Sequence, residues 1–184
     1  MLYTEQQISL ILNAVKFSAE RHRNQRRKDA DSTPYINHPL NVAELLWGLG
    51  GVRDTNVVVA GLLHDLIEDT ETEPKEIRQL FGKQILSLVL EVTDDKRLPK
   101  AERKRLQIVH ATGLSTGAKQ IKLADKIWNV VDITWTPPHN WSRERKMEYL
   151  EWSAEVVAGL RGCNQMLENE FDRVLSVARE KIKD

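Results

Sequence analysis

Gly61-Leu62-Leu63-His64-Asp65-Leu66-Ile67-Glu68-Asp69-Thr70 is the stretch around which the rest of the chain is organised. It follows the apolar run Val57-Val58-Val59-Ala60 without a helix breaker, which predicts a buried helix that continues to about Glu68. Residues four apart lie above one another on a helix, so His64 is placed over Glu68 and Asp65 over Asp69. Because burying an unpaired charge is costly, a bound cation would explain this cluster. A helix end in water, with ordinary solvated carboxylates, is the alternative.

The composition is that of an ordinary globular protein. The 184 residues, 41% hydrophobic and 29% charged, predict one domain over residues 1–184 with a full core. A formal net charge of zero argues against broad capture of nucleic acid or membrane, so neither is expected as a partner. The single cysteine, Cys163, indicates a reducing, cytoplasmic location. Neither a membrane span nor a signal peptide is predicted, and the sequence does not indicate an oligomeric state.

Apolar residues recur at helical spacing along the whole chain. We find no convincing alternating strand pattern, so the predicted fold class is all-α. A capping box of Thr4 and Gln7 begins the first helix. The residues expected on its apolar face are Ile8, Ile11, Leu12, Val15, Ala19 and His22. Thr116 and Ser142 are expected to cap later helices. The predicted helices cover residues 4–22, 39–49, 54–68, 74–81, 85–92, 102–108, 116–131, 142–161 and 167–182.

Two further segments carry candidate metal ligands. His38 stands at a helix start before Pro39, although a lone histidine in such a place is more often structural. Asp125 lies within an almost wholly apolar helix, where a carboxylate needs a partner. Lys122 or Lys126 could form an ordinary salt bridge with it. A metal shared with the histidines is the other interpretation.

Two basic segments contrast with the neutral total charge. One is the loop Arg23–Asp29, and the other runs from Lys96 to Arg105. A solvated surface is the usual explanation of such runs. Arginine forks and lysine charges also suit phosphate oxygens, so either segment could bind an anionic substrate.

The combined pattern resembles a known enzyme family. Two imidazoles and two carboxylates on different helices suit a divalent ion such as Mn²⁺ or Fe²⁺, and their order, His…His-Asp…Asp, resembles the HD superfamily of metal-dependent phosphohydrolases. Residues 4–170 are similar to the stand-alone small alarmone hydrolases of the RelA/SpoT type, which include the metazoan SpoT homologue. The segments that carry this resemblance are Arg26-Arg27-Lys28, Tyr35-Ile36-Asn37-His38-Pro39, His64 to Thr70, Val92 to Lys96, Leu98-Pro99-Lys100, Glu102 to Gln107 and Lys122 to Asn129.

The resemblance implies a single-domain, multi-helix HD phosphohydrolase fold and a Mn²⁺-dependent enzyme. It implies hydrolysis of the 3′-diphosphate of guanosine 3′,5′-bis(diphosphate), (p)ppGpp, to pyrophosphate and GDP or GTP. No length remains for a synthetase domain, so hydrolysis without synthesis is expected. One Mn²⁺, or Fe²⁺ or another divalent ion, would be held by His38, His64, Asp65 and Asp125, with Glu68 and Asp69 as catalytic residues. The implied substrate contacts are Arg27, Lys28, Tyr35, Lys100, Arg105, Asn129, Trp141 and Tyr149.

Other functions remain open from the sequence. On the same site, (p)ppApp or the 2′-phosphate of NADPH could be the substrate. A non-catalytic nucleotide sensor would be expected to lack the acid/base pair, yet Glu68 and Asp69 are both present. An all-helical scaffold protein would leave Asp125 without a buried partner.

Overall fold

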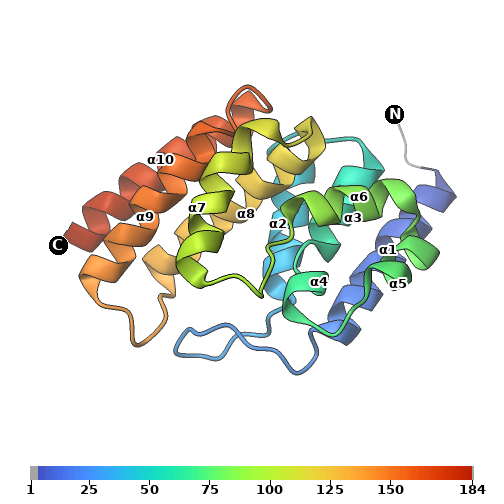
Figure 1. Cartoon of the computed structure of the whole chain (residues 1–184), viewed down its shortest axis with the longest axis horizontal. Helices are drawn as coiled ribbons and strands as arrows, with labels where there is room; N and C mark the ends of the chain where they lie inside the picture. Colours follow the sequence, from blue (N-terminus) through green and yellow to red (C-terminus); the bar gives the residue numbers. More distant parts are fainter. Residues whose placement is uncertain (1–3, 184) are drawn as a thin grey trace.

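The computed structural model describes residues 4–183 and is helical throughout (Figure 1). Among these residues there is no strand, only an isolated antiparallel bridge between Arg26 and Pro34, so the all-α prediction is confirmed. The helices are α1 (Glu5–Arg21), α2 (Asn37–Trp47), α3 (Thr55–Leu63), α4 (Leu66–Asp69), α5 (Pro74–Phe81), α6 (Lys83–Val92), α7 (Lys100–His110), the 3₁₀ turn η1 (Ala111–Gly113), α8 (Thr116–Trp135), α9 (Arg143–Ala158) and α10 (Gln165–Lys183).

Most helix starts follow from local side-chain chemistry. The capping box of Thr4 and Gln7 is present, and the Ser142 side chain accepts a hydrogen bond from the backbone N–H of Arg145. The prediction that Thr116 caps α8 is wrong by one residue. Ser115 is the N-cap, and its hydroxyl accepts from the backbone N–H of Ala118.

Helix α8 occupies the centre of the core. It packs against α10, α2, α3, α6 and α9, and half of its residues are buried. Figure 1 shows α9 and α10 along one side of α8, with α1 and α5 at the opposite end of the molecule. The long connection between α1 and α2 loops out along the lower edge before it returns to α2. This arrangement places the ends of α2 and α3 beside the middle of α8.

The buried face of α1 agrees with the predicted one only in part. Ile11 and Val15 pack against the core and His22 is buried, as expected. Ile8 and Leu12 are 48% and 62% exposed, whereas Ala14 and Ser18 are fully buried. Helix α1 packs on α3, and small side chains on the contacting face let two helices approach closely. The more apolar stripe therefore remains partly in solvent.

The predicted continuous helix through residues 54–68 is also wrong. Helix α3 ends at Leu63, His64 and Asp65 form a turn, and α4 begins at Leu66. Asp65 has φ −93° and ψ −5°, at the edge of the helical region, which reorients the chain between the two helices. The backbone N–H of Asp69 still donates to the carbonyl of Asp65, at 2.8 Å, so these two residues keep the predicted four-residue spacing. The break lets both side chains face the neighbouring helices.

Gly61 of α3 lies close against side chains of α2. A Cβ atom on Gly61 would lie 2.7 Å from Leu46 Cδ1, closer than real contacts allow. The absence of a side chain at this position therefore sets the distance between the helix that carries His38 and the one that precedes His64.

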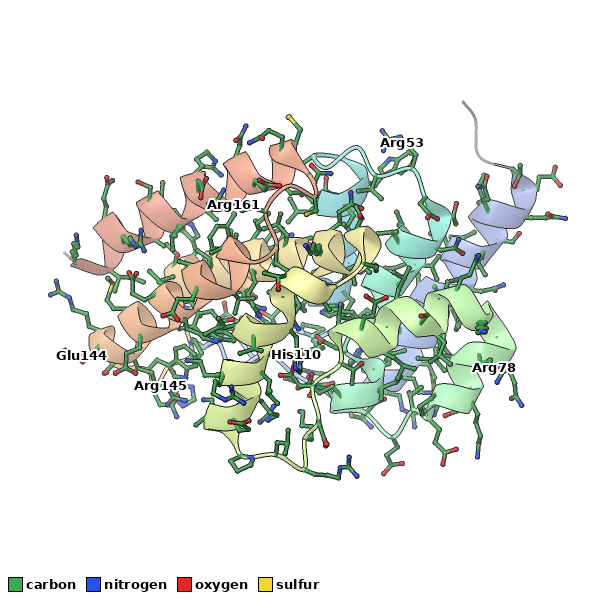
Figure 2. All side chains as sticks on the ribbon, turned by 45° about the horizontal axis from the view of Figure 1, so that its top comes forward. Arg53, Arg78, His110, Glu144, Arg145 and Arg161 are labelled. Carbon is green, nitrogen blue, oxygen red and sulfur yellow. The ribbon has the colours of Figure 1, made fainter. Side chains whose placement is uncertain are left out.

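Many charged side chains lie on the outer surfaces of the helices, as Arg78, Glu144 and Arg161 show in Figure 2. No helix within residues 4–183 is long and apolar enough to cross a membrane.

Candidate active site

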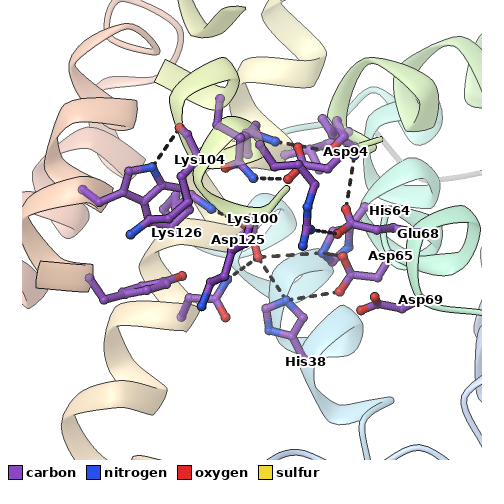
Figure 3. A pocket seen from close by; sticks show the side chains of 18 of the residues that line it. His38, His64, Asp65, Glu68, Asp69, Asp94, Lys100, Lys104, Asp125 and Lys126 are labelled. Atoms are coloured by element: carbon purple, nitrogen blue, oxygen red, sulfur yellow. Dashed lines mark hydrogen bonds and ion pairs between the residues drawn. The ribbon is translucent and has the colours of Figure 1, made fainter. Parts of the chain in front are cut away.

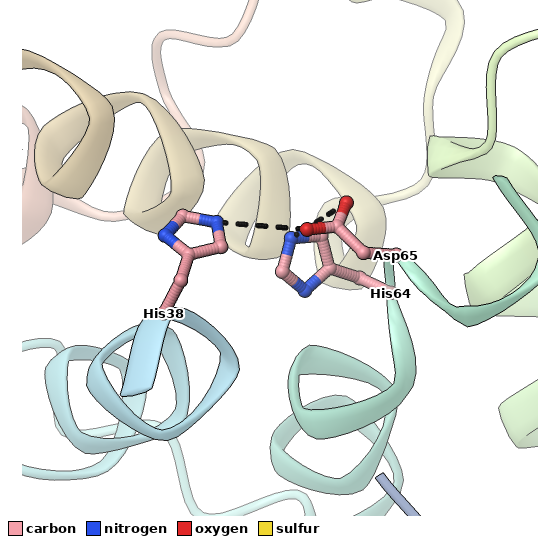
Figure 4. A group of neighbouring side chains, drawn as sticks. All are labelled: His38, His64 and Asp65. Carbon is pink, nitrogen blue, oxygen red and sulfur yellow. Dashed lines mark ion pairs between the residues drawn. The ribbon is translucent and has the colours of Figure 1, made fainter. Parts of the chain in front are cut away.

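Three parts of the fold bring the predicted metal ligands together. His38 comes from the first turn of α2, His64 and Asp65 from the turn between α3 and α4, and Asp125 from the middle of α8. Figure 4 shows the two imidazoles and Asp65 facing one another. One ligand atom from each of these three residues lies within 4.8 Å of the others. Asp125 Oδ1 lies 3.1 Å from Nε2 of His38 and 3.8 Å from Nε2 of His64.

The hydrogen bonds of His64 indicate which of its nitrogens faces the cluster as a ligand. Nδ1 lies 2.8 Å from the carbonyl oxygen of Gly61, so we assign the ring proton to Nδ1. Nε2 is buried and has no well-aligned hydrogen bond, although Asp65 Oδ1 is 3.2 Å away. A buried nitrogen lone pair beside carboxylates, with the other ring nitrogen held by a backbone carbonyl, is the usual arrangement of a histidine metal ligand. The donor set of nitrogen and oxygen atoms therefore fits a divalent ion.

Without an ion, charge pairs stabilise the cluster. Burial alone would lower the pKa of His64, but Asp65 and Asp125 outweigh it and raise that pKa to about 9. Burial opposes ionisation of Asp125, yet Lys126 and His38 hold its pKa well below the usual range. The alternative salt bridge is thus partly present, because Lys126 Nζ lies 3.1 Å from Asp125 Oδ2. Lys122 instead donates to the carbonyl of Val92, at 3.2 Å.

Glu68 and Asp69 lie beside this cluster on α4. Burial and the nearby charge of Asp94 raise the pKa of Glu68 above its ordinary value. Its Oε2 accepts a hydrogen bond from the backbone N–H of Asp94 at 3.2 Å, and Arg103 Nη1 lies 3.4 Å from Oε1. Lys96 forms an ion pair with Asp69 and lies 3.7 Å from Glu68. Figure 3 shows both carboxylates next to Asp65 at the wall of a cavity.

Two adjoining cavities meet at this group of residues. Their volumes are about 350 Å³ and about 600 Å³. The first lies between α4, α7, α8 and α9, and the second lies between α8 and the connection that precedes α2. Both are lined by basic side chains: Lys100, Arg103, Lys104, Lys122, Lys126 and Arg145 in the first, and Arg26, Arg27, Lys28 and Lys96 in the second. The residues that line both are Tyr35, His38, Glu68, Asp69, Asn129, Trp141 and Tyr149.

Most of the predicted substrate contacts line these cavities. Lys100 lines the first, Arg27 and Lys28 the second, and Tyr35, Asn129, Trp141 and Tyr149 line both. Arg27 is also paired with Asp132 and donates to Asn129 Oδ1 at 3.2 Å.

Arg105 is the predicted contact that the structure does not bring to the cavities. Its side chain is exposed, lines neither cavity and pairs with Glu102, with Nη2 2.7 Å from Oε1. On α7 the cavity face instead carries residues with spacings of three and four: Lys100, Arg103, Lys104 and Gln107. A helical repeat counted from Lys100 places Arg103 on the same face and Arg105 on another. The spacing could therefore have indicated Arg103 as the cavity residue.

Two further residues that line the first cavity, Trp152 and Arg145, could not be identified as site residues from the sequence pattern. Trp152, expected in the core, is half-buried and lines the first cavity, with the ammonium groups of Lys104 and Lys126 each 4.6 Å from its ring centre. Arg145 also reaches this cavity from α9. Their side chains meet the site because α9 packs beside α7 and α8, which local patterns do not reveal.

Comparisons with known proteins agree with this geometry. The family model for the HD domain matches residues 14–151. A guanosine-3′,5′-bis(diphosphate) 3′-pyrophosphohydrolase of Xenopus tropicalis is 53% identical over 90% of this chain and 93% of its own length. The Homo sapiens protein of the same description is 52% identical over 86% of this chain and 88% of its own length.

Solved structures show the same fold. A metazoan orthologue of SpoT, described as hydrolysing ppGpp, superimposes with a TM-score of 0.91 and 42% identity, covering 96% of this chain and 98% of that structure. A Listeria monocytogenes protein matches with a TM-score of 0.65 and 31% identity over 78% of this chain and 99% of its own. The chain therefore belongs to the HD-domain family, and within it to the small alarmone hydrolases.

Proposed function

We propose that this protein hydrolyses the 3′-diphosphate of guanosine 3′,5′-bis(diphosphate), releasing pyrophosphate and GDP, or GTP from the pentaphosphate. The observation that carries the proposal is a group of two buried histidines and two partly buried aspartates at the junction of two cavities lined by cations. A nucleotide with a diphosphate on each side of its ribose has the charge distribution that two such cavities complement. The descriptions of the curated relatives support the same substrate.

His38, His64, Asp65 and Asp125 would hold the divalent ion, for which we propose Mn²⁺. The donor set includes no thiolate, which favours Mn²⁺ or Fe²⁺ over a closed structural zinc site. When bound there, such an ion would lower the pKa of the attacking water and neutralise charge on the reacting phosphate.

Glu68 and Asp69 would be the general acid/base residues of the reaction. The oxygen of a water molecule bonds to the phosphorus attached to O3′, the bond from that phosphorus to O3′ breaks, and its electron pair stays on O3′. A Glu68 carboxylate oxygen would accept a proton from the water and would then return that proton to the departing O3′. The raised pKa of Glu68 suits a group that takes up a proton and returns it near neutral pH.

The cations of the two cavities would bind and orient the substrate. Arg27 and Lys28 on one side, and Lys100 and Arg103 on the other, would neutralise the two diphosphates. Trp141 and Tyr149, whose ring centres are 5.7 Å apart, would contact the nucleoside, and Asn129 would fix the ribose or a phosphate. Holding both ends of the nucleotide would keep the 3′-phosphorus near Glu68 and the metal ligands.

The test is one assay of the purified protein with Mn²⁺ on three substrates: ppGpp, ppApp and NADPH. We expect pyrophosphate and GDP from ppGpp at the highest kcat/KM, and no turnover by Glu68→Ala. Release of phosphate without pyrophosphate from ppGpp would overturn the proposal. A higher kcat/KM with ppApp or NADPH would reassign the substrate on the same site.

A further inference from the structure

The hydroxyl of Tyr35 lies between two carboxylates of different predicted roles. Its oxygen is 2.6 Å from Oδ2 of Asp65, a proposed metal ligand, and 3.1 Å from Oδ2 of Asp69, a proposed proton carrier. The sequence indicated only a contact of Tyr35 with the nucleoside. The structure shows instead that this hydroxyl contacts acidic groups on both sides of the turn into α4.

A phenol carries one proton and can donate it to one carboxylate at a time. The shorter distance assigns that hydrogen bond to Asp65 Oδ2. The other oxygen of Asp65, Oδ1, is then the one that faces His64, where it lies 3.2 Å from Nε2. The oxygen that accepts from Tyr35, Oδ2, lies 3.8 Å from Nε2 of His38. Tyr35 therefore fixes the orientation of the carboxylate, with Oδ1 toward His64 and Oδ2 toward His38.

The aromatic ring of Tyr35 is itself held in place by neighbouring groups. The buried ring of His22 packs against it with centres 4.8 Å apart, and His22 Nδ1 is 2.6 Å from Gln25 Oε1. The ring of His38 meets it edge-on, with centres 6.0 Å apart. Rotation of the ring away from Asp65 would disturb both packing contacts.

The backbone around Tyr35 is also fixed. Its N–H donates to the carbonyl of Gln25 at 3.1 Å, and its own carbonyl accepts from the N–H of His38 at 2.9 Å. Between these contacts, Arg26 pairs with Pro34 in the isolated bridge, and the N–H of Arg27 donates to Thr33. The connection between α1 and α2 thus presents the Tyr35 hydroxyl to the turn that carries Asp65.

We propose that Tyr35 is a positioning residue that orients the Asp65 carboxylate for the divalent ion. This inference rests on the proposed metal centre of the hydrolase. Groups that hydrogen-bond to a metal ligand fix its orientation, and their loss typically weakens metal affinity about 10- to 100-fold. Tyr35 acts through Asp65, so its principal effect is on the ion and not on the nucleotide.

The test is Tyr35→Phe, which removes the hydroxyl and keeps the ring that packs on His22. Mn²⁺ affinity is measured by calorimetry on the purified full chain, and kcat and KM for ppGpp are measured at saturating Mn²⁺. We expect the Kd for Mn²⁺ to rise about 10- to 100-fold, with KM within about twofold of the unsubstituted protein. Thermal unfolding without metal should stay close to that of the unsubstituted protein, which shows that the variant folds.

The control is Tyr149→Phe, a change of the same chemistry in the same cavities. The Tyr149 ring packs between Trp141 and Trp152, with centres 5.7 and 5.1 Å away, and we expect its loss of a hydroxyl to leave Mn²⁺ affinity unchanged. Unchanged Mn²⁺ affinity in Tyr35→Phe, or a rise in KM alone, would overturn the inference. If the unsubstituted protein binds Mn²⁺ and hydrolyses no ppGpp, the proposed function fails, and the Mn²⁺ comparison still decides the role of Tyr35.

Discussion

Arg103 Nη1 lies 3.4 Å from Glu68 Oε1, across a sequence separation of 35 residues. This contact joins α7 to α4 at the boundary of the first cavity, where Glu68 is also bound by the backbone N–H of Asp94. The guanidinium is thus placed to hold the proposed proton acceptor and to meet an entering phosphate. Arg105, two residues further along α7, is exposed and pairs with Glu102.

Arg103→Ala should lower kcat/KM for ppGpp by roughly 10- to 100-fold, because it removes a cavity cation and leaves the Glu68 carboxylate with one fewer partner. Steady-state kinetics at saturating Mn²⁺ measure the effect. Arg105→Ala is the matched control on the same helix and should remain within about twofold of the unsubstituted protein. Equal losses in the two variants would contradict the assignment of Arg103 to the site.

Glu68→Gln should abolish hydrolysis and stabilise the metal-free protein at neutral pH. A carboxyl whose pKa is raised on folding stabilises the protein only below its ordinary value of 4.5, and that contribution is lost as pH rises through the raised folded pKa. The ionised form therefore opposes folding at pH 7, and its removal should add roughly 0.5–2 kcal/mol. Denaturant unfolding of Glu68→Gln and of the unsubstituted protein, at pH 7 and at pH 4, measures the difference in their free energies of unfolding. The difference between the two proteins should shrink at pH 4, and a difference that is the same at both values would show that ionisation is not its cause.

Removal of the metal should lower Tm. An ion that binds only the folded chain adds about 2.7 kcal/mol at a concentration 100 times its Kd, which corresponds to roughly 5–10 °C for a protein of this size. Thermal unfolding with Mn²⁺ and after exhaustive chelation measures the change. An identical Tm in both conditions would favour the helical scaffold interpretation over a metal centre.

Asp65→Ala and Asp69→Ala should separate metal binding from proton transfer. Asp65 belongs to the group of three residues whose ligand atoms converge, so its loss should abolish both Mn²⁺ binding and hydrolysis. Asp69 lies one turn away and is paired with Lys96, so its loss should keep the metal and remove most of the rate. Metal content after dialysis and steady-state rates distinguish them. A metal-free Asp69→Ala protein would show that Asp69 is a ligand.

Gly61→Ala should destabilise the fold by about 1–3 kcal/mol, because the new methyl group would lie 2.7 Å from Leu46 Cδ1. The strain should also displace His64, whose Nδ1 bonds to the carbonyl of Gly61, and so weaken Mn²⁺ binding. Denaturant unfolding and calorimetry measure the two effects. Gly113→Ala has no heavy atom within 4 Å of its added Cβ and should stay within about 0.5 kcal/mol of the unsubstituted protein.

The geometry of the site could be predicted from the sequence only in part. Helical spacing was a sound guide to elements, yet it failed at the turn of His64 and Asp65, where the chain leaves the helix to direct both side chains inward. Arg105, which the resemblance implied as a substrate contact, lies outside both cavities, because the basic run on α7 does not indicate which face packs toward α9. The hydroxyl contacts of Tyr35 depend on the shape of the loop before α2. Backbone hydrogen bonds from Tyr35 to Gln25 and from Arg27 to Thr33 hold that loop, and side-chain patterns in the sequence do not reveal them.

The sequence by itself determined the all-helical class, the capped starts at Thr4 and Ser142, and the candidate ligand types, because each depends on spacing or chemistry within a few residues. Only the tertiary structure decided that His38, the His64-Asp65 turn and Asp125 converge, since that depends on how α2, α3 and α8 pack. It alone also decided that Arg103 faces the cavity and that Tyr35 bonds to Asp65. Long-range packing sets these distances, and a local pattern along the chain carries no information about the partner across the core.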